Sequence, residues 1–357
     1  MDPAKPTILV TGVSGNLGRR LLEQLSGYAV VGVDLTPPAV SANASIARFI
    51  PLDLGKEEST RQLHLLIREV QPISVVHLAF VIDPQRTGVV DLDRMWQINV
   101  AGTARVMEAI TEANRLAGTI VRQFIYPSSV AAYGSDLPAP VAEDAPLQGH
   151  TLAYAIHKRE CDLVVQQRSP SVRGCGVFIL RPHIFAGATV ENYLMGAFRG
   201  TPNGKGVRAA RMRERGERLP CMLPYGQKYL DNQIQFLHID DMARLIAWLL
   251  KREPEAQRLT ILNVAGRGEP LKLSQSIQMA KAKLFRVPGQ WGMRLMLKYL
   301  WARKISTIPP DAVPYMVGQY IMNTDRLKKF LGNDYERVIT KTNQEAFADS
   351  FQKSASA

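Results

Sequence analysis

Residues 7–18 read TILVTGVSGNLG, an apolar run that leads into a turn with three glycines, Gly12, Gly15 and Gly18. The first five residues are β-prone and apolar, as a buried parallel strand requires, and the leucines up to Ser26 have helical spacing. Between strand and helix, glycine lets the backbone turn tightly and approach a pyrophosphate without a Cβ in the way. The helix N-terminus offers unpaired N–H groups and a partial positive charge to that anion. The stretch therefore predicts a dinucleotide-binding turn.

A carboxylate supports the same prediction. Asp34 closes the next apolar run, AVVGVD, and lies 16 residues after Gly18. At this position it can accept hydrogen bonds from the ribose hydroxyls of NAD, and it would repel the additional phosphate of NADP. A tight turn and a solvated aspartate would also explain these residues one by one, but their conjunction favours a ligand. We predict NAD as the cofactor.

Length and composition set loose bounds. A chain of 357 residues, 46% of them hydrophobic, can bury a full core and suggests one large domain plus a smaller one. It has no run of 18 apolar residues, and its start, MDPAKP, lacks the pattern of a signal segment. We therefore expect a soluble, cytoplasmic protein without stable membrane insertion. Cys161, Cys175 and Cys221 lie far apart and the six histidines lack ligand spacing, so we expect a reducing compartment and no metal.

Of the net charge of +12, one stretch carries +5. Residues 199–218 hold seven basic and two acidic residues, and their glycines and proline predict a loop. The loop could be simply solvated, or it could grip an anionic substrate or an acidic membrane. Arg208 and Arg211 are its candidate substrate contacts. Nucleic acid is not an expected partner, because no aromatic residue is interleaved with the basic ones.

Strand and helix patterns alternate over the first 180 residues. Beyond the opening unit, strands are expected at 29–34, 46–54, 74–79, 122–129 and 176–182, and helices at 56–70, 92–116 and 151–167. This alternation predicts an α/β fold with a Rossmann-type doubly wound parallel sheet, whose ligands bind at the carboxyl ends of the strands. We assign residues 1–185 and about 236–268 to this domain. Residues of about 186–235 and 269–357 form the smaller, mostly helical substrate domain.

The sequence YAIHK contains the strongest candidate for chemistry. Tyr154 and Lys158 are four residues apart, so they share one face of the expected helix. Tyrosine is a poor base, with a pKa of about 10, but a nearby ammonium group stabilises its phenolate. Tyr154 could then take the proton of a secondary alcohol while hydride leaves the carbon for NAD. Ser129, at the end of the preceding strand, can hold the reacting oxygen. A surface pair is the ordinary explanation of this spacing, but its place after that strand favours catalysis.

Several short motifs occur along the chain in the same order as in a known protein family. They are TGVSGNLG (11–18), Asp34, LDL (52–54), HLA (77–79), NVAGT (99–103), YPSSVAAYG (126–134), YAIHK (154–158), LRPHIFAG (180–187) and FLHIDD (236–241). Over about residues 1–265 the chain resembles the extended short-chain dehydrogenases/reductases. Within them it is similar to the NAD-dependent epimerase/dehydratase family, including the UDP-glucose 4-epimerase-like members.

The resemblance implies which residues hold the cofactor. In chain order they are Gly12, Gly15, Asn16, Leu17, Gly18, Asp34, Asp53, Leu54, Leu78, Ala79, Asn99, Tyr154, Lys158 and Pro182. Asn99 matches a family asparagine near the nicotinamide, although it would fit equally as a core residue with satisfied hydrogen bonds. Ser129, Tyr154 and Lys158 would form the catalytic triad, and a homodimer is expected.

The substrate is less well defined. Sugar-nucleotide members usually carry an asparagine where this chain has Ile184, and an arginine where it has Ile234. Asn192 does match a segment that contacts the nucleotide, and Arg208 and Arg211 could replace the lost phosphate contacts. Residues 284–301 are apolar and aromatic with basic residues interspersed, which fits a packed helix, a lid over an apolar substrate or a membrane-surface helix.

Three classes of function follow. The first is hydride transfer between NAD and a secondary alcohol or ketone of a small-molecule substrate, with nucleotide-sugar epimerisation as one version. The second is a dehydrogenase or reductase of an apolar, hydroxysteroid-like alcohol. The third, a non-catalytic NAD-binding protein, is disfavoured because Ser129, Tyr154 and Lys158 are all present.

Overall fold

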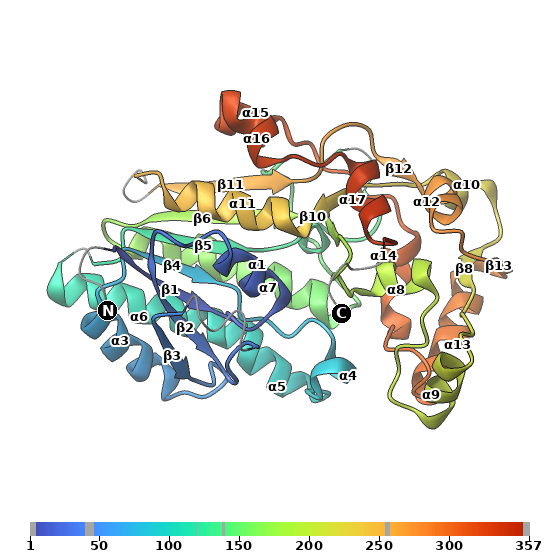
Figure 1. Ribbon diagram of the computed structural model, residues 1–357, viewed down its shortest axis with the longest axis horizontal. Coiled ribbons are helices and arrows are strands. Elements are labelled where there is room, and N and C mark those ends of the chain that lie inside the picture. Colours follow the sequence, from blue (N-terminus) through green and yellow to red (C-terminus); the bar gives the residue numbers. More distant parts are fainter. Residues whose placement is uncertain (1–4, 40–45, 119, 138–139, 254–257, 353–357) are drawn as a thin grey trace.

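The computed structural model describes residues 5–39, 46–118, 120–137, 140–253 and 258–352. Its centre is a seven-stranded sheet in the order β11-β6-β5-β4-β1-β2-β3, and every pairing in it is parallel (Figure 1). The strands are β1 (Thr7–Thr11), β2 (Ala29–Asp34), β3 (Arg48–Pro51), β4 (Ser74–His77), β5 (Gln123–Pro127), β6 (Gly176–Pro182) and β11 (Leu259–Val264). The predicted Rossmann-type sheet is confirmed.

Helices cover both faces of the sheet. They are α1 (Asn16–Leu22) and α11 (Ile239–Leu250) on one face, and α3 (Ser59–Val70), α6 (Gly102–Ala117) and α7 (Ala153–Arg168) on the other. Successive side chains of strand β1 point to opposite faces of the sheet. Ile8 and Val10 pack in the core with α1 and α11, and Leu9 packs in the core with α3, α6 and α7. Strand β1 is therefore apolar on both sides, as a strand in the middle of a buried parallel sheet requires.

The expected helix 92–116 is interrupted. It consists of α5 (Leu92–Trp96), a π-helical turn, η1 (Gln97–Ala101), and α6. Asn99 lies in this turn, and its amide oxygen accepts a hydrogen bond from the N–H of Val81 at 2.7 Å while its amide nitrogen donates to Val81 O at 3.0 Å. The turn thereby fixes the loop that follows β4.

A second core lies beside the sheet. It contains the small sheets β10–β7, β12–β9 and β13–β8 together with most of the later helices (Figure 1). The elements are β7 (Ile184–Ala186), α8 (Tyr193–Arg199), α9 (Val207–Glu214), β8 (Cys221–Pro224), α10 (Gln227–Asp231), β9 (Gln233–Ile234), β10 (Phe236–His238), β12 (Leu271–Lys272), α12 (Leu273–Met279), β13 (Leu284–Val287), α13 (Gly289–Ala302), α14 (Val313–Val317) and α17 (Asn343–Asp349). Helix α9 lies within the stretch 199–218, so the prediction of a loop is wrong for those eight residues.

Part of the C-terminal region packs on the sheet instead. Helices α15 (Asp325–Leu331) and α16 (Tyr335–Val338) contribute Leu327, Leu331 and Val338 to the core beneath α1 and α11. The stretch 269–357 thus contributes to both cores. Within the described ranges, no helix has the length and apolar character needed to cross a membrane.

A buried ion pair joins helix α7 to the sheet. Arg181 on β6 donates to both carboxylate oxygens of Asp162 on α7, at 2.8 and 2.9 Å, and the two side chains are 1% and 0% exposed. The guanidinium also donates to the Tyr133 hydroxyl at 2.7 Å and to Glu143 O at 2.8 Å. Tyr133 in turn donates to Asn263 on β11 at 2.7 Å. One side chain therefore ties together β6, β11, α7 and the turn after Ser129.

We expect Arg181→Met to lower the free energy of unfolding by about 3–5 kcal/mol, because it leaves the Asp162 carboxylate buried and unpaired. Adding Asp162→Leu should recover part of the loss, since no unpaired charge then remains. Urea unfolding measures both. The control, Arg122→Met, breaks an exposed pair with Glu253 and should cost less than about 1 kcal/mol. Equal losses in Arg181→Met and in the control would contradict this account.

Candidate active site

The site begins where the winding of the sheet changes direction. Strands β1 and β4 are neighbours, and the chain proceeds from β1 to β3 on one side and from β4 to β11 on the other. Ligands of such sheets bind in the crevice at the carboxyl ends of these two strands. The glycine turn follows β1 and the segment Leu78–Ala79 follows β4, so both motifs meet at the crevice.

The three glycines have different roles. Gly12 has φ +70°, and a Cβ on it would lie 2.4 Å from Ala79 N; a Cβ on Gly18 would lie 2.4 Å from Val13 O. Both positions therefore need glycine so that the turn and α1 can pack closely. A Cβ on Gly15 would meet only Gly12 O, at 3.2 Å, and no side chain caps α1. Gly15 is thus open toward the crevice, as the approach of a pyrophosphate requires.

Asp34 is held beside this turn. Its two carboxylate oxygens accept hydrogen bonds from Ser14 N at 3.0 Å and Leu35 N at 2.7 Å. Each oxygen keeps a lone pair with which to accept from a ribose hydroxyl. The cradle therefore fits NAD, with the glycine turn for the pyrophosphate and Asp34 for the adenosine ribose.

Other residues of the expected cofactor set are engaged within the protein. Asp53 pairs with Arg94 and accepts from Gly55 N, and the Leu54 side chain is buried in the core. The Asn16 amide donates to Thr189 O at 2.9 Å, and Leu17 packs between the two cores. The amide oxygen and amide nitrogen of Asn99 both form hydrogen bonds with the backbone of Val81. Asn99 is therefore a core residue with satisfied hydrogen bonds, one of the two roles that its motif allowed. Their contacts with the cofactor stay predictions.

The candidate catalytic side chains come from two adjacent elements. Ser129 precedes a short 3-10 turn and accepts a hydrogen bond from Ala131 N at 3.1 Å, and Tyr154 and Lys158 lie on α7. Burial raises the pKa of Tyr154, and a hydrogen bond with Ser129 opposes this rise. Burial lowers the pKa of Lys158 to about 8. The structure therefore brings Ser129 and Tyr154 together.

Phe80 contacts both helix residues. The Lys158 ammonium lies 3.8 Å from the centre of the Phe80 ring and donates to Pro127 O at 2.8 Å. The Tyr154 ring meets Phe80 edge to face, at 5.8 Å between ring centres. The sequence analysis did not identify Phe80; its only signal is its position directly after HLA.

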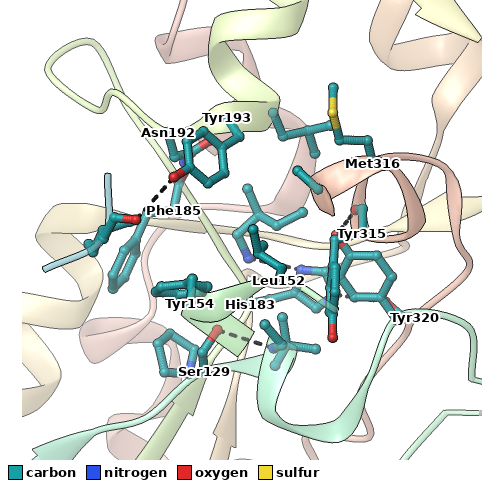
Figure 2. A pocket seen from close by; sticks show the side chains of 17 residues that line it. Ser129, Leu152, Tyr154, His183, Phe185, Asn192, Tyr193, Tyr315, Met316 and Tyr320 are labelled. Carbon is teal, nitrogen blue, oxygen red and sulfur yellow. Dashed lines mark hydrogen bonds between the residues drawn. The ribbon is translucent and has the colours of Figure 1, made fainter. Parts of the chain in front are cut away.

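A pocket of about 140 Å³ opens in front of Tyr154. Figure 2 shows Ser129 and Tyr154 on one side of it and Tyr315 and Tyr320 opposite. Its walls are mostly aliphatic and aromatic, and among the described residues no Asp, Glu, Lys or Arg lines it. The lining residues are Ile82, Ser129, Val130, Ala131, Leu152, Tyr154, Pro182, His183, Ile184, Phe185, Asn192, Tyr193, Leu194, Ala312, Tyr315, Met316 and Tyr320.

Two lining residues illustrate how the polar groups are used. Burial lowers the pKa of His183 to about 4, so the ring is neutral, and its Nε2 contacts Tyr320 O at 2.8 Å. Asn192 caps α8 by accepting from Met195 N, and its amide nitrogen donates to Phe185 O. Both side chains are satisfied within the protein, and the hydroxyls of Tyr193, Tyr315 and Tyr320 donate to backbone carbonyls. The pocket therefore offers a substrate mainly the hydroxyls of Ser129 and Tyr154 and an apolar wall.

The candidate arginines lie elsewhere. Arg208 and Arg211 are exposed on α9, where Arg208 donates to the Tyr299 hydroxyl at 3.2 Å, and neither lines the pocket. Ile184 does line it, whereas Ile234 is buried in β9. The apolar residues that depart from the sugar-nucleotide pattern are thus part of the pocket wall or the core behind it.

We expect Gly15→Ala to weaken NAD binding by about tenfold or more, because the new methyl group occupies the space that the pyrophosphate needs. Calorimetric titration with NAD measures the change. The matched control is Gly27→Ala, whose Cβ would meet nothing within 4 Å and which should bind NAD normally. Wild-type affinity in a folded Gly15→Ala protein would place the pyrophosphate elsewhere.

Curated proteins with similar sequences match part of this chain. The UDP-glucose 4-epimerase of Azospirillum brasilense is 27% identical over 143 residues, which cover 40% of this chain and 39% of that protein. An uncharacterized epimerase/dehydratase of Staphylococcus aureus is 24% identical over 163 residues, 44% and 47% of the two chains. The matches thus span less than half the length of these curated relatives.

Solved structures match over nearly the whole fold. The UDP-glucose 4-epimerase of Thermotoga maritima with UDP-glucose has a TM-score of 0.66 at 18% identity, over 97% of this chain and 98% of that one. The Thermus thermophilus UDP-glucose 4-epimerase in complex with NAD has a TM-score of 0.66 at 17% identity, over 96% and 97%. A family model described as "NAD dependent epimerase/dehydratase family" matches residues 8–265. The chain therefore belongs to this family, and the family's NAD dependence agrees with the predicted cofactor.

Proposed function

We propose that this protein transfers a hydride between NAD and a secondary alcohol whose body is apolar. The observation that carries the proposal is the pocket in front of Tyr154, where two hydroxyl groups face a wall of aliphatic and aromatic side chains. A nucleotide diphosphate would need cations to balance its charge, and none of the described residues that line this pocket supplies one. An apolar alcohol gains from the same wall.

Ser129 and Tyr154 would hold the reacting oxygen. Both line the pocket, so an alcohol oxygen between them could accept a hydrogen bond from Ser129 and give its proton to Tyr154. When bound, NAD supplies the acceptor for the hydride that leaves the alcohol carbon. In the reverse direction, Tyr154 returns the proton to the oxygen of the ketone.

Lys158 would make Tyr154 a usable base. Burial alone raises the pKa of Tyr154, so a neighbouring cation is needed to bring it toward neutral pH. The Lys158 ammonium uses one of its three donors on Pro127 O, and the others remain for the cofactor. The Phe80 ring covers this ammonium and shields the chemistry from water.

Nucleotide-sugar epimerisation is the second candidate, and a polar cavity of about 380 Å³ favours it. This cavity shares Ile82, Asn192 and Tyr193 with the apolar pocket, and Arg199, Lys205 and Arg213 line it. However, Arg199 donates to the backbone carbonyls of 187, 190 and 350, and Arg213 donates to those of 202 and 204. The two arginines hold loops together, which makes them poorer phosphate ligands.

We expect Tyr154→Phe to bind NAD normally and to lose about 10²–10⁴-fold in kcat, because it removes the group that exchanges the proton. The assay follows NADH formation with steroid-like secondary alcohols. Tyr225→Phe, which alters an exposed tyrosine outside the pocket, is the matched control and should keep full activity. Near-normal turnover by Tyr154→Phe would refute the proposed mechanism.

Replacing Arg208, Arg211 and Arg213 together with alanine separates the two candidates. An enzyme of apolar alcohols should keep its KM for the alcohol, because these side chains do not line its pocket. A sugar-nucleotide enzyme should instead show a higher KM for UDP-sugars, and its wild-type KM should rise with salt. Turnover of UDP-sugars with that pattern would favour the second candidate.

A further inference from the structure

The outer face of α13 is apolar and exposed. Trp291, Leu295 and Tyr299 are 64%, 57% and 45% exposed, and their spacing of four residues aligns them in one stripe along the helix. On the inner face, Met293 and Leu297 are buried in the second core. Helix α13 is therefore apolar on two sides, of which the core covers only one.

Basic residues frame this stripe. Arg294 and Lys298 follow one edge of it, and Arg303 and Lys304 stand at its end. Residues 284–304 contain five Lys and Arg and no Asp or Glu. The outer side of α13 thus combines exposed aromatic and aliphatic groups with positive charge.

Helix α9 adds to the same surface. Gly206 N donates to Lys304 O at 2.9 Å, and Arg208 on α9 reaches the Tyr299 hydroxyl on α13. Figure 1 shows α9 and α13 together at the end of the molecule opposite to β3 and α3. The basic stretch 199–218 and the basic helix α13 therefore form one positively charged end.

We propose that α9 and the outer stripe of α13 (Trp291, Leu295 and Tyr299) bind the surface of an anionic phospholipid bilayer. A helix of this kind lies in the interface with its apolar side chains among the acyl chains. Tryptophan and tyrosine favour that depth, and Lys and Arg can bury their stems while their charges contact the headgroups. The cations attract anionic lipids over a Debye length.

Charge decides between a bilayer and a second copy of the chain. A symmetric dimer through this stripe would bring each copy's Arg294 and Lys298 against the same surface of the other copy. Asp311 pairs with Arg294, but no acidic residue within 284–304 offsets Lys298, Arg303 and Lys304, so like charges would face each other across the contact. An anionic lipid surface complements both the charge and the stripe.

Helix α13 lies between the proposed lipid-binding surface and the pocket of Tyr154. Its inner residues Met293, Leu297 and Leu300 line an internal cavity together with Met316, and Met316 also lines the pocket of Tyr154. A bilayer on the outer face would therefore lie one helix away from the substrate pocket. Delivery of an apolar alcohol from the membrane rests on the proposed function; the binding of lipid does not.

Vesicle sedimentation of the full chain tests the proposal. The protein should sediment with vesicles of phosphatidylcholine that contain phosphatidylserine, and about tenfold less with phosphatidylcholine alone or at high salt. Trp291→Ser combined with Leu295→Ser should lower the partition coefficient by about tenfold or more. The matched control, Leu65→Ser with Leu116→Ser, changes two exposed leucines of α3 and α6 and should bind like the wild type. NAD titration verifies that each variant is folded.

Three outcomes would overturn the proposal. They are no sedimentation with phosphatidylserine vesicles, equal sedimentation of wild type and the α13 variant, or a lipid-free dimer that the α13 variant abolishes without any vesicle binding. The last result would assign the stripe to a second copy of the chain. Because none of these measurements involves turnover, failure of the proposed function would leave them unchanged.

Discussion

The ion pair between Arg181 and Asp162 is the contact on which the geometry of the candidate active site depends. Removing two charges from water is costly, and only good geometry and additional hydrogen bonds offset that cost. Arg181 meets both conditions. Its Nε and Nη2 donate to the two carboxylate oxygens of Asp162, and its Nη1 donates to the Tyr133 hydroxyl and to Glu143 O. Helix α7 is thereby fixed against β6, and Tyr154 faces the turn that starts at Ser129.

The sequence predicted the parts of this site that depend on local patterns. Gly12, Gly15 and Gly18 have different roles, yet each role is readable from a strand, a tight turn and a helix in succession. Helix α9 escaped prediction because Gly and Pro on both sides suggested a loop, whereas its own Ala, Arg, Met and Glu residues favour a helix. The π turn at Gln97–Ala101 escaped as well, since an inserted residue hardly changes the apolar spacing.

The far wall of the pocket could not be predicted in this way. Tyr315, Met316 and Tyr320 reach it from more than 150 residues beyond Tyr154, and no motif marks them. Contacts between distant parts of the chain also decide what a motif does not. Asn99 forms hydrogen bonds with the loop after β4, and α15 and α16 pack in the same core as α1 and α11. Such contacts follow from the folded chain as a whole.

The distribution of charge links the site to the rest of the surface. Lys158 is buried against Phe80 and Pro127 O, so its ammonium group is held inside the candidate site and away from the exposed surface. Exposed cations gather at α9 and α13, where the apolar stripe also lies. A net charge of +12 therefore does not imply an anionic substrate in this fold. The described residues that line the pocket carry no Asp, Glu, Lys or Arg, whereas the exposed cations lie on the outside of α9 and α13, where they would attract an anionic surface.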